Sequence, residues 1–510
     1  MKKKMNILML LADDFGAWAM GCAGNPEVKT PNLDRLAKNG VRFENCFCAS
    51  PVCSPARVSI FTGRNPSQHG VHDWLAKGHL DWEEAVSESL REKLENSSEW
   101  FCAWPKSQLY GDTAIRYMDG LSSFPERLAE NGYECALSGK WHMGDSFHPQ
   151  CGFSYWATTA MGGDNYFYPV VMENGKMVLK ENCYITELIT DHALEFLRMR
   201  SGEKPFYLSV HYTAPHSPWA EKHHPKAYID MYRDCPFNST PNLPPHPWAP
   251  NGKKSLAQWN REKHEGIRFS GAKFGPVPET WQEHRRESLT GYYAAITAMD
   301  AQIGRLLGFL EETGLIDSTL IIFTSDNGMS MGHHGIWGKG NGTNPVNMYD
   351  SAVKVPCIFQ YPGSSRNGTV CHEMISHYDF YQTILDIAGV SWEEDTSMPG
   401  QSFAPLICGD AKWQRKNSVV VLDEYGPCRM LRTREWKLVL RLPNGPDELY
   451  DLQNDPDEAE NLICSPRHQD LVSQLKTELE RWFARYVDPQ FDGSKEAVSG
   501  HGQLARHSFL

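Results

Sequence analysis

Short, predominantly apolar runs recur along the chain and alternate with longer amphipathic segments. The runs at 7–12, 206–210 and 319–324 are typical of strands buried on both faces of a parallel sheet. Segments such as 184–200 and 289–310 carry apolar residues at helical spacing. This alternation predicts an α/β fold with a mostly parallel central sheet flanked by helices.

One long stretch interrupts the alternation. Residues 220–287 are rich in Pro, His, Trp and Asn and show no clear period. A long irregular excursion inside a compact domain is usually a functional loop or lid. We therefore interpret residues 220–287 as an irregular insertion within a main α/β domain that covers residues 1–400.

The pattern changes again after Gly400. Residues 418–423 and 429–441 alternate like antiparallel strands, and residues 469–486 have the period of a closing helix. We predict that residues 401–510 form a smaller C-terminal α+β subdomain with an antiparallel sheet, followed by a tail.

Composition excludes several classes of protein. Lys and Arg number 50 against 63 Asp and Glu, a net charge of −13, which argues against a general nucleic-acid binder. The 14 cysteines are scattered without CxxC spacing, so neither a zinc ribbon nor a disulfide scaffold is indicated, and we expect reduced thiols. No apolar segment is long enough to span a membrane.

The N-terminus can be interpreted in two ways. Three lysines at 2–4 precede the apolar run 7–12, as in a secretory signal peptide. However, the run is short, lacks a cleavage site of small residues, and leads directly into Asp13 and Asp14. We interpret it as a buried strand and expect a cytoplasmic protein of a bacterium; the alternative is export to the periplasm.

Residues 53–63 have the pattern of a short helix that begins at Cys53. Pro55 suits the first turn of a helix, and Gly63 suits the position just past its end. Cys53 would then lie at the helix N-terminus, where free N–H groups favour an anion, with Arg57 one turn further on. These residues alone fit either a reactive side chain in an anion site or a buried structural cysteine.

Polar side chains follow four predicted strands, the three apolar runs named above and a further strand at 133–138. In open α/β sheets, ligands bind at the carboxyl ends of the strands. The residues at these ends are Asp13, Asp14, Lys140, His142, His211, His216, Asp326 and Asn327. Carboxylate and amide oxygens are hard ligands, which suit Ca²⁺ or Mg²⁺ better than zinc.

Together these residues carry a family resemblance. Residues 53–57, Cys-Ser-Pro-Ala-Arg, look like the C/S-x-P-x-R signature of the type I sulfatases, and the match continues through Gly63. A second sulfatase signature is similar to residues 132–142, and the strand-end acids, His216 and Lys339 also resemble the family pattern. The resemblance extends from residue 6 to about 480, and it implies an alkaline-phosphatase-like α/β domain with a C-terminal antiparallel subdomain.

The resemblance also implies a modified residue and a metal. In this family the signature cysteine, here Cys53, is oxidised to Cα-formylglycine by a sulfatase-maturing enzyme. Its hydrate would be the nucleophile and would form a covalent sulfated intermediate. The ligands of a Ca²⁺ ion, with Mg²⁺ as the alternative, would be Asp13, Asp14, Asp326, Asn327 and the modified residue 53.

The remaining roles follow the same resemblance. Arg57 would hold the hydrated residue, and Lys140 and Lys339 would bind sulfate oxygens. His142 would take the proton that triggers sulfate release. His216 would protonate the leaving oxygen with help from Lys339. For His211, a role in the site and a buried place behind it both remain open.

Known members of the family act on sulfated glycans, aryl sulfates or choline sulfate. The insertion is dense in His and Trp, whose rings suit sugar faces, so we expect a sulfuric ester hydrolase of a saccharide derived from glycosaminoglycan or mucin. Two alternatives remain: a phosphonate or phosphate monoester hydrolase of the same superfamily, and a non-catalytic protein that binds sulfated glycans.

Overall fold

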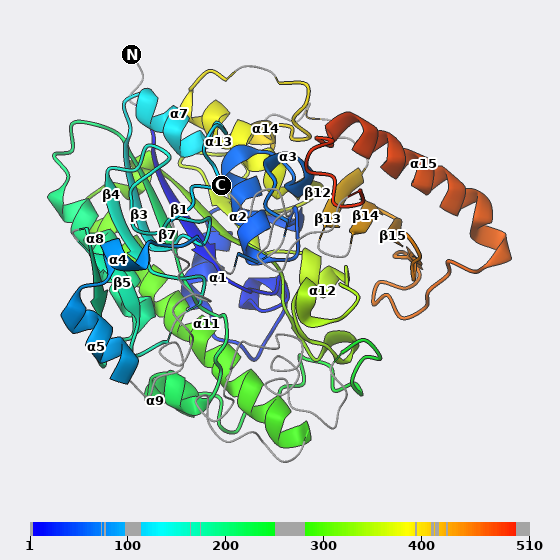
Figure 1. Ribbon diagram of the computed structural model, residues 1–510, viewed down its shortest axis with the longest axis horizontal. Coiled ribbons are helices and arrows are strands. Elements are labelled where there is room, and N and C mark those ends of the chain that lie inside the picture. The colour runs from blue at the N-terminus through cyan, green and yellow to red at the C-terminus, as the bar shows by residue number, and fades with distance from the viewer. Residues whose placement is uncertain are drawn as a thin grey trace.

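The computed structural model centres on one large sheet (Figure 1). It describes residues 4–495, except 73, 76–77, 97–113, 164, 174, 250–280, 393–394, 410–412, 414–417 and 425–426. The sheet has ten strands in the order β12-β2-β11-β8-β1-β7-β3-β4-β5-β6. These are β1 (Asn6–Ala12), β2 (Val41–Phe47), β3 (Glu134–Lys140), β4 (Tyr155–Thr159), β5 (Val170–Glu173), β6 (Lys176–Leu179), β7 (Phe206–His211), β8 (Thr319–Ser325), β11 (Cys357–Gln360) and β12 (Thr369–Ser376).

Most neighbouring strands of this sheet are parallel. β8, β1, β7, β3 and β4 form a continuous parallel block, and β12 runs parallel to β2. β11 is antiparallel to both of its neighbours, and β5 and β6 form an antiparallel hairpin at one edge. The predicted mostly parallel α/β fold is therefore confirmed.

Two apolar cores lie on opposite faces of the sheet. In β1, Ile7, Met9 and Leu11 point into one core, and the alternating residues Leu8, Leu10 and Ala12 point into the other. Because both faces are buried, the strand is apolar from Ile7 to Ala12, and this makes it recognisable in the sequence. The cytoplasmic location that we predicted for the protein from this run stays a prediction.

Helices cover both faces of the sheet. Residues of α2, α7 and α13 belong to one core, and residues of α1, α8 and α11 belong to the other. Their bounds are α1 (Pro31–Lys38), α2 (Cys53–Thr62), α7 (Phe124–Glu130), α8 (Ile185–Met199), α11 (Trp281–Glu312) and α13 (Phe380–Ala388). Shorter helices are α3 (Pro66–His69), α4 (Trp82–Ala85), α5 (Glu88–Asn96), α9 (Lys226–Asp230), α12 (Asp350–Val353) and α14 (Ala404–Cys408). Among the described helices, none is long and apolar enough to cross a membrane.

One predicted strand is wrong at its start. The apolar residues 353–359 predict a strand, but Val353 ends α12 and β11 begins only at Cys357. β11 lies between β2 and β8, so its residues must donate to neighbours, and Pro356 has no N–H to donate. The strand therefore starts after the proline.

The C-terminal part forms a separate antiparallel sheet. Its strands are β13 (Ser418–Asp423), β14 (Cys428–Thr433), β15 (Trp436–Arg441) and β16 (Glu448–Asp451). Helix α15 (Gln469–Tyr486) packs its apolar side on this sheet, and Figure 1 shows it at the periphery of the molecule. The predicted domain limits at residues 400 and 401 stay predictions, and residues 496–510 of the predicted tail lie outside the described part.

The two parts of the chain are joined by ion pairs to Asp350, in α12. Lys437 of β15 and Arg432 of β14 both contact its carboxylate. Main-chain contacts add to them, because the N–H of Leu422 in β13 donates to the carbonyl of Ala49 at 3.1 Å. The C-terminal sheet is therefore fixed against the segment just before β11.

The predicted insertion is described only in part. Residues 220–249 contain α9 and connecting loops, and residues 281–287 belong to α11, which begins earlier than the predicted 289. Residues 250–280, the centre of the predicted insertion, lie outside the described residues.

Phe61 of α2 offers a test of this packing. Its buried ring lies 5.3 Å from that of Phe124 and 5.7 Å from that of Trp141, between centroids. We expect Phe61→Ala to lower the free energy of unfolding by about 3–5 kcal/mol, measured by urea denaturation. The exposed control Met199→Ala should change it by less than about 0.5 kcal/mol. Equal stability of the two variants would contradict the packing described.

Candidate active site

The candidate site lies where the carboxyl ends of the central strands meet. In the sheet, Leu11 is paired with His211, Ala12 with Ser325, and Gly139 with His211. The residues that follow these pairs are therefore neighbours in space. This register brings Asp13, Asp14, Lys140, Asp326 and Asn327 together, as expected for an open α/β sheet.

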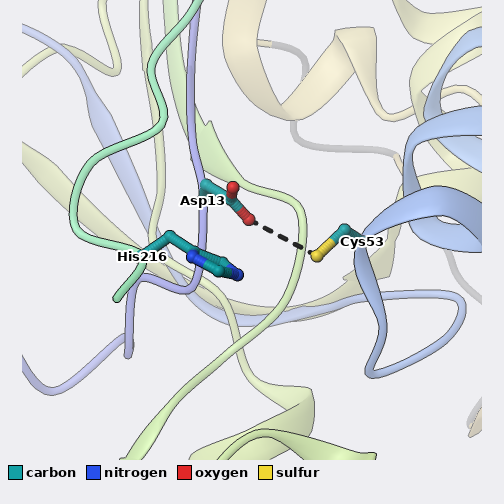
Figure 2. Close-up of side chains that lie close together, drawn as sticks. All are labelled: Asp13, Cys53 and His216. Carbon is teal, nitrogen blue, oxygen red and sulfur yellow. Dashed lines mark hydrogen bonds between the residues drawn. The ribbon is translucent and has the colours of Figure 1, made fainter. Parts of the chain in front are cut away.

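Helix α2 points its N-terminus at this cluster. Cys53 is its first residue, and it ends at Thr62 with Gly63 in the left-handed conformation, φ 68°, as the sequence predicts. Figure 2 shows Cys53 facing Asp13, with His216 beside the pair. The Cys53 Sγ lies 3.5 Å from Asp13 Oδ1.

Arg57 lies one turn after Cys53 and is completely buried. Its Nε donates to Asp326 Oδ2 at 2.9 Å, and its Nη1 donates to the carbonyl of Lys140 at 3.0 Å. It thus links α2 to the ends of β8 and β3. The guanidinium fits this place because it stays charged when buried and donates in fixed directions.

Three buried carboxylates share the centre of the site. Oxygens of Asp13, Asp14 and Asp326 lie within 4.8 Å of one another. Burial and the charge of Asp326 raise the pKa of Asp13. Burial also acts against the charge of Asp14 and Asp326, but Lys339 lowers the pKa of Asp14, and Arg57 and Lys140 lower that of Asp326. Such a group of charges needs cations nearby to exist in one place.

The donor set fits a hard divalent cation. Asn327 Nδ2 donates to Asp14 Oδ1 at 2.8 Å, while its Oδ1 is buried and has no hydrogen-bond partner among the described residues. A buried amide oxygen without a partner is costly unless something binds it. Together with the three carboxylates, it supplies the oxygen ligands that Ca²⁺ and Mg²⁺ prefer.

The thiol of Cys53 is in an unfavourable place for a thiolate. Burial raises its pKa to about 12, although Lys140 and Lys339 act in the opposite direction. The thiolate is the reactive form of cysteine, so the encoded side chain is a weak nucleophile at neutral pH. Its position at the centre of the site and its low reactivity are thus in conflict.

Two lysines approach this centre from different elements. Lys140, at the end of β3, contacts Asp13 through its ammonium. Lys339 follows β10 (Trp337–Gly338), which pairs with β9 (Ser330–Met331), and its Nζ lies 2.6 Å from both Asp14 Oδ1 and Cys53 Sγ. Burial opposes the charge of Lys339, but Asp14 raises its pKa well above the usual value. Lys339 is therefore a permanent cation beside residue 53.

His142 has the properties of a buried base. Its Nε2 lies 3.2 Å from the carbonyl of Leu75, which can only accept, so the proton is on Nε2 and Nδ1 carries the lone pair. Burial and then Lys140 hold its pKa well below the usual range. The ring is therefore neutral at neutral pH, with its lone pair on Nδ1.

His216 differs from His142 in exposure and in its contacts. Its side chain is 27% exposed, and Nε2 lies 3.6 Å from Asp14 Oδ2. Nδ1 donates to the carbonyl of Ser217 at 2.8 Å, which turns Nε2 toward the site. The hydroxyl of Tyr166 donates to the His216 carbonyl at 2.8 Å and fixes the loop. This partly open position suits an exchange of protons with a bound ligand.

His211 lies behind the site. Its Nδ1 donates to the carbonyl of Lys140 at 2.9 Å, and its Nε2 accepts from Ser209 Oγ at 2.7 Å. Burial and then Arg57 lower its pKa to about 3. Both ring nitrogens are engaged within the protein, so of the two interpretations left open the geometry favours the buried one.

Two residues near the site are not found by sequence reasoning. The hydroxyl of Tyr292, in α11, donates to the carbonyl of Asp14 at 2.9 Å and accepts from the N–H of Gly16 at 3.0 Å. It holds Asp14, whose φ is 61°, a strained value for a residue other than glycine. Gly162 lies so close to His142 that a Cβ there would be 2.1 Å from Nε2. The only signal in the sequence is the pair of glycines after β4.

Comparison with known proteins agrees with this geometry. The family model described as sulfatase matches residues 5–390, which is more than half of the chain. The chain belongs to the sulfatase family. A second model, for the C-terminal part of N-sulphoglucosamine sulphohydrolase, matches residues 332–485 of this sulfatase. The alkaline-phosphatase-like fold and the activity of a sulfuric ester hydrolase expected from the sequence are thereby confirmed.

Individual relatives extend over almost the whole sulfatase. The N-acetylglucosamine-6-O-sulfatase of Bacteroides thetaiotaomicron is 28% identical, with 97% of this chain and 89% of that protein covered. The arylsulfatase of Clostridium perfringens is 27% identical and covers 96% of this chain and 97% of its own length. A solved structure in complex with its substrate D-glucosamine-2-N,6-O-disulfate has a TM-score of 0.72 at 25% identity, over 97% of this chain and 100% of that one.

The glycine pair gives a matched test of the histidine geometry. Gly162→Ala places a methyl group against the His142 ring, whereas a Cβ on Gly163 would be 3.8 Å from His216 Cε1, an ordinary contact. We expect Gly162→Ala to lower kcat/KM for sulfate release by about 10²-fold, because small displacements of catalytic groups are costly. Gly163→Ala should keep the parental value. Unchanged kinetics in folded Gly162→Ala would disprove the contact.

Proposed function

We propose that this sulfatase hydrolyses a sulfate ester of a saccharide after Cys53 has been oxidised to Cα-formylglycine. The observation that carries the proposal is the environment of residue 53. It is buried at the N-terminus of α2, 2.6 Å from a lysine ammonium and 3.5 Å from the carboxylate of Asp13, yet its thiol is held protonated. A nucleophile is placed there, but cysteine is a poor one in this setting.

The modification would resolve this conflict. Hydrated formylglycine supplies two hydroxyls on one carbon, one to attack sulfur and one whose deprotonation expels sulfate and restores the aldehyde. Arg57 is fixed by Asp326 on one side and by the carbonyl of Lys140 on the other. It is therefore rigid enough to orient the modified side chain and to balance its charge.

Residues for a metal are also in place. Asp13, Asp14, Asp326 and Asn327, with the modified residue 53, would hold Ca²⁺, and Mg²⁺ is the alternative. A bound divalent cation supplies Lewis acidity, which makes an oxygen near it easier to deprotonate. The free Oδ1 of Asn327 and the shared carboxylates support this assignment.

Cations line the place where sulfate would sit. Lys339 stands beside residue 53, and Lys140 approaches the same centre from β3. Both ammoniums would contact sulfate oxygens as negative charge grows in the transition state. Lys140 is completely buried at the end of a central strand, so it requires little rearrangement when the substrate binds.

The two histidines would divide the proton transfers. His142 is buried and neutral, with its lone pair on Nδ1, so it would take the proton from residue 53 when sulfate is released. His216 is partly exposed and presents Nε2 to the site, so it would protonate the leaving sugar oxygen, with Lys339 assisting. Their different environments support this division of roles.

The relatives favour a sulfated amino sugar as the substrate. An N-acetylglucosamine-6-O-sulfatase matches the chain over 97% of its length, and the solved relative contains D-glucosamine-2-N,6-O-disulfate as its substrate. We propose a glucosamine sulfate released from a glycosaminoglycan or a mucin. The side chain of His216 is partly exposed, so a substrate can reach this side of the site from solvent.

This proposal is tested with protein coexpressed with a sulfatase-maturing enzyme. We expect sulfate release from at least one of glucosamine 6-O-sulfate, glucosamine N-sulfate, galactosamine 4-O-sulfate and a 2-O-sulfated uronic acid, measured by ion chromatography. Cys53→Ala should abolish release, because it removes the precursor of the nucleophile, while thermal unfolding stays close to that of the parent. Release that persists in Cys53→Ala, or a matured protein inert on the whole panel, would refute the proposal.

The cationic site itself could hold a phosphorus ester as well as a sulfate ester. The phosphonate monoester hydrolase of Agrobacterium radiobacter shares the fold, with a TM-score of 0.67 at 19% identity. We expect kcat/KM for p-nitrophenyl sulfate to exceed that for p-nitrophenyl phenylphosphonate by at least about tenfold, or 1.4 kcal/mol of transition-state stabilisation. The reverse order, measured by nitrophenol absorbance, would identify a phosphonate hydrolase instead.

A further inference from the structure

The loop that carries Lys339 has little regular structure of its own. It runs from the end of β10 to the start of α12 and contains only a short 3₁₀ turn at Gly340–Gly342. Lys140, by contrast, is the last residue of a central strand. Lys339 therefore needs some other support to keep its ammonium within 2.6 Å of Cys53 Sγ.

Asn347 provides that support from inside the loop. Its side chain is completely buried. Its Nδ2 donates to the carbonyls of Lys339 at 3.1 Å and Gly340 at 3.0 Å, and to Thr343 Oγ1 at 3.1 Å. Its main-chain N–H donates to the Gly340 carbonyl as well, at 3.1 Å. One amide group thus closes the loop around the residue that bears the ammonium.

The C-terminal sheet holds the chain on both sides of Asn347. Arg441 Nε donates to the carbonyl of Val346 at 3.0 Å, and Lys437 Nζ donates to the carbonyl of Met348 at 3.0 Å. Both cations belong to β15 and are four residues apart, so they project from the same face of the strand. Both are buried, and Lys437 also contacts Asp350, at the start of α12.

We propose that Asn347 is a positioning residue for Lys339, and that β15 anchors it from the C-terminal sheet. Asn347 acts through the main chain of residues 339–340. Of these two side chains, only that of Lys339 contacts residue 53. The C-terminal sheet thereby sets the place of one cation of the site. This inference rests on the proposed function for the role of Lys339 in sulfate binding.

The side-chain amide of Asn347 is a hydrogen-bond donor surrounded by acceptors. The Nδ2 group of Asn347 faces three oxygen atoms, two of them main-chain carbonyls that can only accept. In Asn347→Asp a carboxylate of almost the same shape would face these oxygens without a proton to donate. The loop would have to move away, and a buried acceptor without a donor is unfavourable.

The test compares Asn347→Asp with a matched control, Asn367→Asp. Asn367 also donates from Nδ2 to a main-chain carbonyl, that of Tyr361 at 3.1 Å, in a turn that follows β11. In matured protein, we expect Asn347→Asp to lower kcat/KM by about 10²-fold and to raise the inhibition constant of inorganic sulfate at least tenfold. Asn367→Asp should leave both unchanged. Asn347→Ala, which introduces no charge, should change both in the same direction.

A double-mutant cycle separates positioning from general support. If Asn347 acts through Lys339, then Lys339→Met should cost much less in Asn347→Asp than in the parent, because coupled residues are not additive. If the double variant instead loses kcat/KM by the product of the two single losses, the inference is overturned. So would a folded Asn347→Asp variant with parental kcat/KM and parental inhibition by sulfate.

The role of Asn347 can also be tested by sulfate binding, which requires no turnover. Sulfate binding can be measured by titration calorimetry on the unmatured protein, which keeps Lys339. If the matured parent releases no sulfate from any ester, the proposed function fails, while weaker binding of sulfate to Asn347→Asp than to the parent still supports the inference. Equal binding by parent and variant, or no binding by the parent, overturns it.

Discussion

Mutual repulsion of three buried carboxylates is the constraint on which this structure depends. Asp13, Asp14 and Asp326 sit within 4.8 Å of one another, away from water. Arg57, Lys140 and Lys339 each contact one of them. The cations come from a helix, a strand end and a loop, so charge balance in the site ties together elements that are remote in sequence.

Much of the fold and of the acidic cluster could be predicted from the sequence. A strand buried on both faces must be apolar throughout, so β1 and β8 are visible as runs, and the acids that end them are visible as breaks. The parallel arrangement then places Asp13 and Asp326 at one edge of the sheet. The resemblance to the sulfatases added Lys339, which no periodicity indicates.

The supporting residues could not be predicted, for a physical reason. Tyr292 occupies a buried face of α11, where an aromatic residue is ordinary. Only its hydrogen bonds to Asp14 and Gly16 show that it supports the site. Asn347 and Gly162 lie in irregular segments without period. Their importance depends on partners brought near by the fold. The start of β11 differs from the prediction because Pro356, which cannot donate to a neighbouring strand, interrupts an otherwise apolar stretch.

The residues that surround Cys53 in the folded protein are synthesised at different times. In the finished protein Lys339 lies 2.6 Å from residue 53, Asp326 binds Arg57 one turn further along α2, and β1 pairs with β7 and β8. During synthesis at about 5–20 residues per second, these partners emerge on the order of tens of seconds after residue 53. If Cys53 is oxidised as proposed, the enzyme that does so would have that interval to reach it before these partners close around it.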